Sequence, residues 1–273
     1  MPLKSYISSI SRLRTLNQSV TIDLFKYILV ISVLCWFTVR GNERLGYNWQ
    51  WFQIPHFLFS LENGSFTAGP LLRGLIITLK ITGISLISAL LTGLAAALLR
   101  LSKSLSGNIL AFLYIEIIRN TPLLIQLFFI YFVISPILGI SRFASAVIAL
   151  SLFEGAYISE ILRGGILSID KGQWEAVYSL GLKPVHIYSK IILPQAVRRI
   201  LPPLTGQAIS LIKDSALVST IAIYDLTMEG RIIISETYLT FEIWFTIALI
   251  YLILTVTISL FVKKMEKQLK VGY

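Results

Sequence analysis

The chain has 273 residues with 24 Lys and Arg against 14 Asp and Glu, a formal net charge of +10, yet 55% of its residues are hydrophobic and only 14% are charged. Soluble domains commonly have about 25% charged residues, so the composition excludes an ordinary water-soluble enzyme. It also excludes a nucleic-acid binder, which needs dense exposed basic patches, whereas long uncharged runs separate these cations. We therefore expect a polytopic membrane protein. The single Cys35 and two distant histidines exclude a disulfide framework within the chain and a Cys or His metal motif.

The first apolar segment, residues 22–39, carries Asp23 and Lys26 near its start. Basic residues before an apolar core also fit a cleaved signal peptide. However, the core ends in bulky residues and then Arg40, with no small-x-small cleavage site. The pattern therefore favours an uncleaved first transmembrane helix. Residues 41–69 follow as a polar and aromatic external segment, whose rings suit the membrane interface.

A helix that crosses a bilayer needs about 20 mostly apolar residues, and five further segments meet this length. Three of them, residues 81–99, 120–141 and 243–262, carry no charge over 19, 22 and 20 residues. The other two, 143–162 and 200–218, each contain two charged residues. The sequence thus predicts an all-α fold with six transmembrane helices.

The distribution of basic residues orients these spans, because Lys and Arg tend to remain on the cytoplasmic side. With the N-terminus inside, sixteen of the 24 Lys and Arg fall on that side. Both termini are therefore expected in the cytoplasm. Five basic residues fall on the outer side: Arg40, Arg44, Arg73, Arg142 and Arg231. The other three, Lys80, Lys213 and Arg119, lie at membrane depth or are unassigned.

Residues 167–194, which connect the fourth and fifth spans, are the most informative segment. Asp170 can accept the first free amide hydrogens of a helix, and Gly181 can end that helix in the left-handed conformation. Pro184 can begin a second short helix, which is expected to stop before Pro194. These features alone leave two readings open: an amphipathic hairpin on the anionic inner leaflet, or a docking element for another protein.

The run WEAVYSLGLKPVHIYSKIILP at 174–194 resembles the loop signature of ABC importer permeases, which is Glu-Ala-Ala, three residues, Gly, nine residues and Ile-x-Leu-Pro. Val177 stands where the family has its second Ala, and this change is expected to alter docking slightly. Four further blocks resemble the polar amino acid permease subfamily: GLIITLKIT at 74–82, RNTPLLIQLFFIYF at 119–132, EGAYISEILRGGI at 154–166 and KDSALV at 213–218.

The resemblance implies a type I ABC permease in a bacterial inner membrane, with a five-helix core and one additional N-terminal helix. It divides the chain into residues 1–72 (N-terminal tail, first transmembrane helix and external segment), the permease domain 73–265, and a cytoplasmic tail, 266–273. It also implies partners: ABC ATP-binding subunits, a second permease copy or paralogue, and an extracytoplasmic amino-acid-binding protein, with membrane lipid around the spans.

In the family, the loop seats in a cleft of the ATP-hydrolysing subunit. The residues expected to couple the two proteins are Glu175, Ala176, Gly181, Leu182 and Pro184. The chain contains no Gly-x-x-x-x-Gly-Lys-Ser/Thr motif to cradle phosphates. We therefore expect no cofactor and no enzyme activity on this chain, with ATP and Mg bound by the partner ATPase.

Polar residues at membrane depth are candidates for substrate binding. Gln207, Ser210 and Asp214 recur on one stripe of a helix. Asp214 could bind the ammonium group of an amino acid or neutralise a neighbouring cation. Lys213 lies about 100° further around the helix, where it could bind the substrate carboxylate or snorkel to the outer interface.

The fourth span contains two acidic residues with different expected partners. Glu154 could contact the substrate or form a salt bridge with Lys80. Glu160 precedes Arg163 by three residues, so a local ion pair is expected.

Thr121 and Pro122 mark either a bend or a simple boundary between a surface helix and the third span, since proline removes a hydrogen bond and disfavours helix in the residue before it. Broken helices can expose backbone groups to a ligand, so Thr121 is a candidate, and Gln126 is the more plausible side-chain contact.

The second span carries small residues that allow close packing, within the chain or against a second permease: Ser85, Ser88, Ala89, Thr92, Gly93 and Ala96.

These observations predict the permease subunit of an ATP-driven importer for a polar amino acid, leaning to an acidic or amide side chain. The alternative is a secondary transporter or channel that works without ATP. No internal repeat relates the first three spans to the last three, which weighs against a transporter built from inverted repeats. A membrane-embedded enzyme lacks a nucleophile beside a histidine base and an assignable pair of catalytic acids.

Overall fold

A computed structural model describes residues 26–33, 36, 40, 47–62, 65–179, 181 and 183–270. The chain divides into two units, Met1–Gln50 and Trp51–Tyr273. In the first unit, residues 26–33, 36 and 40 are helical, and the Arg40 guanidinium lies 5.6 Å from the ring centroid of Trp36. The remainder of the predicted first span, 22–39, lies outside the described residues.

The second unit begins with a short aromatic segment and a hairpin. A 3-10 helix, Trp51–Gln53, leads into α2 (Ile54–Leu58), and β1 (Phe59–Glu62) pairs antiparallel with β2 (Ser65–Ala68). The expected all-helical chain therefore contains one small two-stranded sheet among the described residues. The hairpin leads directly into the first long helix of the unit, α3 (Pro70–Leu101).

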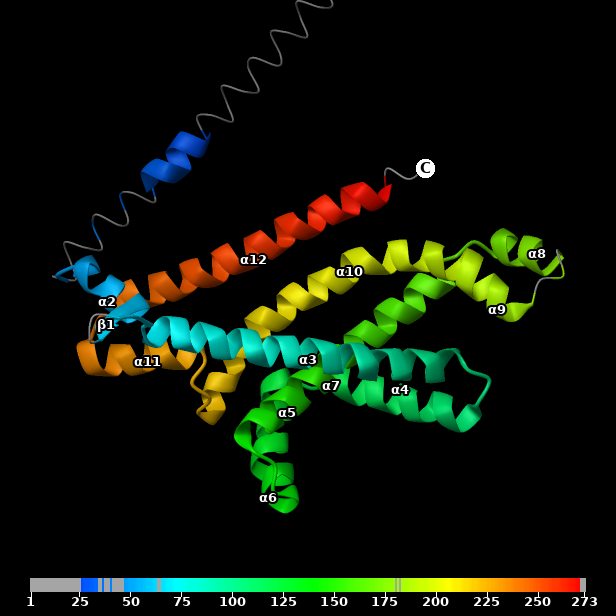
Figure 1. Ribbon diagram of the computed structural model, residues 1–273, viewed down its shortest axis with the longest axis horizontal. Coiled ribbons are helices and arrows are strands. Elements are labelled where there is room, and N and C mark those ends of the chain that lie inside the picture. Colours follow the sequence, from blue (N-terminus) through cyan, green and yellow to red (C-terminus); the bar gives the residue numbers. More distant parts are fainter. Residues whose placement is uncertain are drawn as a thin grey trace, which may run out of the picture. The chain divides into compact units, whose positions relative to one another are not determined.

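Helices form almost all of the remaining unit (Figure 1). The α8–α9 region and the turn between α3 and α4 lie at one end of this unit, and α2, the hairpin and α11 lie at the other. The helices are α3 (Pro70–Leu101), α4 (Leu105–Arg119), α5 (Leu123–Phe128), α6 (Ser135–Leu138), α7 (Arg142–Leu167), α8 (Lys171–Ser179), α9 (Pro184–Ile187), α10 (Leu193–Asp214), α11 (Leu226–Thr237) and α12 (Thr240–Lys270).

Three described helices are long and apolar enough to cross a membrane: α3, α7 and α12 as far as Lys264. They contain the predicted spans 81–99, 143–162 and 243–262. Among the described residues, length and composition allow a fourth span if α4 and the stretch from α5 to α6 are taken together, and these are bent by 107°. The bend at Thr121–Pro122 is thereby confirmed. The predicted span 120–141 is helical from Leu123 to Leu138, with a π-helical turn, Phe129–Ile134, between α5 and α6.

The predicted span 200–218 is α-helical in α10 as far as Asp214 and continues as a 3-10 helix, Ser215–Ile221. This helix is less apolar than α3, α7 and α12 and is not one of the three that could cross a membrane by length and composition. Its four charged residues are Arg198, Arg199, Lys213 and Asp214. The total of six spans therefore stays a prediction.

The small residues of α3 pack against α7. Ser85, Ala89 and Gly93 are buried, and a Cβ added at Gly93 would lie 2.7 Å from Cγ2 of Ile158. The Ser151 hydroxyl also donates a hydrogen bond to the Ser85 carbonyl at 3.3 Å. The small residues of α3 thus pack within the chain, which is one of the two alternatives from the sequence, the other being contact with a second permease.

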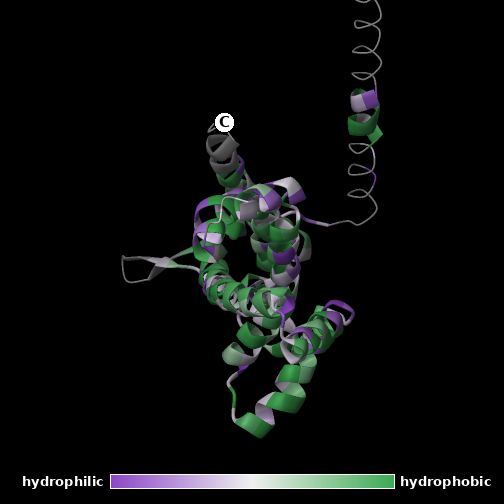
Figure 2. Ribbon diagram, turned by 90° about the vertical axis from the view of Figure 1, so that its right-hand side faces the viewer, coloured by the Kyte–Doolittle hydropathy of each residue, from purple (hydrophilic) through white to green (hydrophobic). Residues whose placement is uncertain are grey.

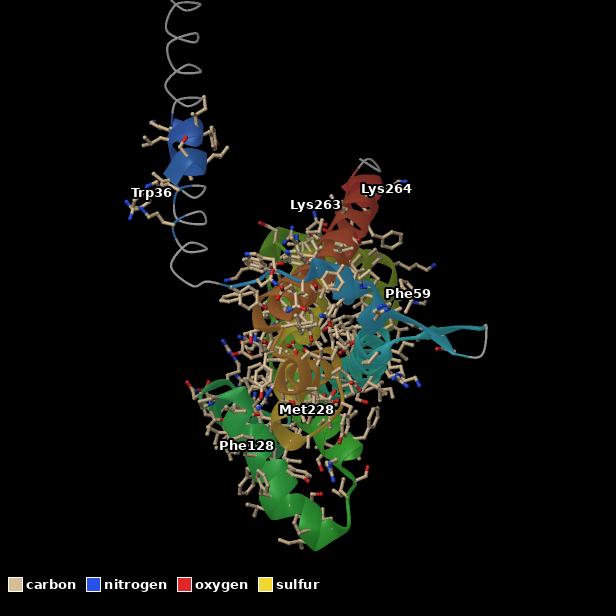
Figure 3. All side chains as sticks on the ribbon, turned by 90° about the vertical axis from the view of Figure 1, so that its left-hand side faces the viewer. Trp36, Phe59, Phe128, Met228, Lys263 and Lys264 are labelled. Carbon is tan, nitrogen blue, oxygen red and sulfur yellow. The ribbon has the colours of Figure 1, made fainter. Side chains whose placement is uncertain are left out.

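Hydrophobic residues make up much of the long helices (Figure 2), and many of their large side chains are exposed. On α12, for example, Leu249, Leu252 and Ile253 are exposed. Lys263 and Lys264 lie near the far end of the same helix (Figure 3). This distribution suits a helix that contacts lipid along its length and water at its end.

Candidate functional site

The loop between α7 and α10 contains the helix start and helix stop that the sequence predicts. The Gly172 N–H donates to Oδ1 of Asp170 at 2.7 Å, so Asp170 caps the start of α8. Gly181 has φ +65°, the left-handed conformation expected after a helix. The second helix, α9, begins at Pro184 as expected.

The expectation that this second helix stops before Pro194 is wrong. A π-helical turn, Tyr188–Ile192, connects α9 directly to α10. The Leu193 N–H donates to the carbonyl of Tyr188, five residues back. In a regular α-helix, the ring of Pro194 would clash with the carbonyl four residues back. The π-helical turn is wider than an α-helical turn and lies directly before Pro194, so the helix continues past this residue.

One side of the loop is a small hydrophobic core. Val177, Ile187 and Ile192 are buried there with residues from the ends of α7 and α10. The Trp174 ring stacks on Tyr178 with centroids 6.2 Å apart and meets Tyr188 edge-on at 5.5 Å. Because Val177 points into this core, replacing the family's Ala with Val changes the packing of the loop and not its exposed surface.

The other side of the loop is exposed and partly apolar. Glu175, Ala176 and Gly181 are all exposed, and so are Tyr178 and Val185. Glu175 forms no salt bridge with any residue in the described part of the chain. Leu182 lies outside the described residues, and for Pro184 only the backbone is described. The loop is therefore a compact element with an outer surface that the described part of the chain leaves exposed.

The three polar residues of the predicted stripe lie on α10. Gln207, Ser210 and Asp214 are each half-buried, whereas Lys213 is exposed. No salt bridge joins Lys213 and Asp214 among the described side chains. The stripe can thus receive a polar ligand, and its role in binding stays a prediction.

Glu154 is one of the most deeply buried polar residues of the described chain, with 1% of its surface exposed. Its Oε2 atom has no hydrogen-bond partner, and no salt bridge reaches it among the described residues. Lys80 is exposed on α3 and forms no salt bridge with Glu154. The predicted alternative of a salt bridge between Glu154 and Lys80 is therefore not formed, and contact of Glu154 with the substrate stays a prediction.

Gln126 and Thr121 stabilise the bend between α4 and α5. The Gln126 side-chain nitrogen lies 2.7 Å from the Ile118 carbonyl, 2.9 Å from the Thr121 carbonyl and 2.8 Å from Oγ1 of Thr121. Gln126 is 9% exposed, and its Oε1 atom has no hydrogen-bond partner. The donors of Gln126 are therefore occupied by the bend, and only its acceptor remains for a ligand.

The predicted ion pair of Glu160 and Arg163 is present and bidentate. Nε of Arg163 donates to Oε1 at 3.1 Å and Nη2 donates to Oε2 at 2.8 Å. Arg119, at the end of α4, lies 4.0 Å from the same carboxylate and above the ring of Tyr157. Nothing in the sequence joined Arg119 to α7, because the contact depends on how the two helices cross.

Three long apolar helices with exposed hydrophobic side chains are the features of a multi-pass membrane protein. Comparison with known proteins identifies the family. Residues 89–271 match the family of binding-protein-dependent transport system inner membrane components, and the chain belongs to this family. It is an ABC importer permease subunit of the polar amino acid permease subfamily and a multi-pass inner-membrane protein.

Two relatives illustrate the match. The chain is 39% identical over 204 residues to the glutamine transport system permease protein GlnP of Escherichia coli (strain K12), an alignment that covers 74% of this chain and 93% of the relative. It is 40% identical, with a TM-score of 0.69, to a chain from the crystal structure of an amino acid ABC transporter with histidines, covering 73% of this chain and 94% of that one. The MetNI methionine ABC transporter, 23% identical with a TM-score of 0.61, shares the fold.

Proposed function

We propose that this chain forms the translocation path of an ATP-driven import system for a polar amino acid, and that separate ABC ATP-binding subunits dock on residues 167–194. The observation that carries the proposal is the two-sided loop. Its inner side packs on α7 and α10, while its outer side exposes Glu175, Ala176 and Gly181. The same side exposes the apolar side chains of Tyr178 and Val185, which the described part of the chain does not cover, and exposed apolar surface is typical of a docking site.

The remaining parts of the system are proposed from the family. ATP and Mg bind to the ATPase, a second permease copy or paralogue completes the path, and a soluble binding protein delivers the amino acid from outside. Both termini are proposed to be cytoplasmic. Support comes from the end of the unit that carries α8 and α9, where the α3–α4 turn brings Arg100 and Lys103.

The orientation can be tested by labelling. A cysteine introduced at Lys270 in a chain without Cys35 should react with a membrane-impermeant maleimide only after the cytoplasmic side is opened. Labelling of intact cells from outside would reverse the topology.

The substrate is proposed to bind near the stripe of α10 and the acidic residue of α7. Asp214 would receive the ammonium group of the amino acid and Lys213 its carboxylate, with Glu154 deeper in the protein. Gln126 and Thr121 would contribute acceptor atoms at the bend. The sequence leans to an acidic or amide side chain, which is consistent with a relative named for glutamine, while another related structure contains histidines.

Transport then requires two arrangements of the helices that ATP and substrate stabilise differently. Closure of the ATPase pair on bound ATP would move the docked loops, and α7 and α10 would carry this movement to the residues that bind the amino acid. The path would open outward, receive the substrate and return.

The proposal is tested with the permease, ATPase and binding protein reconstituted together in proteoliposomes. Uptake of a radiolabelled amino acid should require ATP and stop when the ATPase carries an inactivating substitution in its phosphate-binding loop. Uptake that continues with the inactive ATPase would establish a secondary transporter or channel instead.

Asp214→Ala should lower uptake by at least about tenfold, because a ligand ammonium group would lose its buried partner, while recovery of the assembled complex stays unchanged. Glu236→Ala, which removes a carboxylate from the exposed surface of α11, is the matched control for loss of a charge outside the predicted stripe and the docking loop. Uptake by Asp214→Ala at the rate of the parent protein would refute the assignment of Asp214.

A further inference from the structure

The connection from α6 to α7 encloses a cavity of about 440 Å³, at the end of the arm that α5 and α6 form (Figure 1). The turn beside it is closed by local contacts: Gly139 has a left-handed φ of +65°, and the buried Ser135 hydroxyl donates to the carbonyl of Ile140. Ligand sites commonly have volumes of about 300–1,000 Å³. None of the residues that line the cavity belongs to the proposed amino-acid site, so the cavity is a separate candidate site.

Two side chains that line the cavity have hydrogen-bond donors that the described chain leaves unused. The guanidinium of Arg142 has five N–H groups, and its one partner in the structure is the Ala222 carbonyl, 3.2 Å from Nη1. No carboxylate among the described residues forms a salt bridge with Arg142. The hydroxyl of Tyr131, which also lines the cavity, has no hydrogen-bond partner in the described part of the chain. A cation and a hydroxyl donor together suit an anionic acceptor.

The rest of the cavity wall is largely apolar and continues onto the outer surface of the arm. Phe132, Pro136 and Ile140 line the cavity. Next to it, Ile137 and Leu138 on α6 are 75% and 65% exposed. The donors and the apolar surface lie side by side, so the arrangement fits an amphipathic ligand with an anionic head and an apolar body.

The position of the cavity on α7 indicates where such a ligand would come from. α7 is long and apolar enough to cross a membrane, and Arg142 is its first residue. The two ends of a membrane-crossing helix lie near the two membrane surfaces, and the other end of α7 leads into the loop 167–194. The cavity therefore lies at the level of the lipid head groups in the leaflet opposite that loop. Phosphate is the anionic group at this level, and the planar guanidinium matches it in geometry.

We propose that this cavity binds the phosphate group of a membrane phospholipid, with the Arg142 guanidinium and the Tyr131 hydroxyl as donors. The acyl chains lie on the exposed apolar side chains of α6. The site goes beyond the proposed function, because none of these groups is assigned to the amino acid or to the ATPase. Arg142 also donates to the Ala222 carbonyl, so the bound lipid would join the arm to the segment that follows the 3-10 helix Ser215–Ile221.

The test is photo-crosslinking of lipid to the assembled permease complex in detergent. The probe is a phosphatidylglycerol with a diazirine near the carboxyl end of one acyl chain, and the cross-linked peptides are mapped by mass spectrometry. Cross-links are expected within residues 128–142. A monogalactosyl diacylglycerol with the same two chains has no phosphate and is the matched control lipid. It should label this segment at least about tenfold less, the ratio that corresponds to about 1.4 kcal/mol from a hydrogen bond to a charged group.

Three variants test the two donors. Arg142→Gln should lower labelling of residues 128–142 by phosphatidylglycerol by about tenfold, to the level of the galactolipid. Tyr131→Phe removes only the hydroxyl and should lower it about fivefold, the factor that one net hydrogen bond of about 1 kcal/mol provides. Arg231→Gln makes the same change as Arg142→Gln on the exposed surface of α11 and should leave labelling unchanged.

Each alternative has its own result. Equal labelling by the two lipids would reduce the site to apolar contact and overturn the proposal, as would unchanged labelling in Arg142→Gln. Loss of phosphatidylglycerol labelling in millimolar inorganic phosphate would assign the cavity to a soluble anion instead. Absence of labelling in the parent complex would mean that a partner protein covers the cavity, which also overturns the proposal. If Arg142→Gln fails to assemble, the comparison of the two lipids on the parent complex still decides. None of these measurements depends on transport, so they hold whether or not the chain is an importer.

Discussion

The loop at 167–194 and the bend at 117–140 use the same backbone devices for opposite purposes. Each contains a π-helical turn and a glycine with φ +65°, Gly181 in the loop and Gly139 in the bend. In the loop, polar and apolar side chains remain exposed. In the bend, Gln126 directs its donors back to the carbonyls that the break leaves free.

The difference follows from what surrounds each region. A loop in water can leave its carbonyls to the solvent, so its surface is available for a partner. A break within apolar helices must satisfy its own backbone groups, because no water is available in the bilayer core. The comparison predicts that substitutions in the loop impair assembly and transport, whereas substitutions in the bend impair stability.

The largest effect is expected for Gly181→Trp. A bulky side chain on the outer surface of the loop should prevent seating of the ATPase and reduce ATP-dependent uptake to background, measured together with recovery of the ATPase on the tagged permease. Gly139→Trp is the matched control, since both glycines have the same φ and open space at the Cβ position. Both variants carry the same left-handed strain of about 1–2 kcal/mol, so equal losses of assembly would contradict a docking role for Gly181.

An intermediate effect is expected for Gln126→Leu. The substitution leaves two backbone carbonyls of the bend without their donor, which should lower the free energy of unfolding by about 2 kcal/mol or more. The measurement is the thermal stability of the purified permease in detergent. Gln195→Leu, which removes a part-buried bond to the Ile191 carbonyl near the loop, should cost less, and the reverse order would contradict the comparison.

The smallest effect is expected for Val177→Ala, which restores the residue of the family signature. Loss of two buried methyl groups should lower the stability of the loop by about 1–2 kcal/mol, seen as faster proteolysis between α7 and α10, while uptake remains within about twofold of the parent protein. Val185→Ala removes the same atoms from an exposed position and should leave proteolysis unchanged. A large loss of uptake for Val177→Ala would place Val177 on the docking surface.

The sequence predicted those features that depend on neighbouring residues. The cap at Asp170, the left-handed Gly181, the ion pair of Glu160 and Arg163, and the break at Pro122 all follow from local rules, and all are present. Asn63-Gly64 is also a local signal, typical of a two-residue hairpin turn, and it could have revealed the strands on either side of it.

Features that depend on distant contacts could not be predicted in this way. Gln126 faces carbonyls of the preceding helix because the span folds back sharply, and Arg119 meets Glu160 because α4 crosses α7. The absence of an ion pair between Lys80 and Glu154 depends on which face of α3 packs on α7. In each case the side-chain type was informative, but its partner was set by the packing of helices.

The unbroken connection from α9 through the π-helical turn to α10 has a mechanical consequence. From Pro184 to Asp214 the chain passes from α9 through the π-helical turn into α10 without an intervening loop. Long helices bend at π-helical turns and at prolines, so this stretch has two such places, one at Tyr188–Ile192 with Pro194 and one at Pro202-Pro203 within α10. A tilt of the loop therefore reaches Asp214 only through both bends, and their two angles set how far that carboxylate moves.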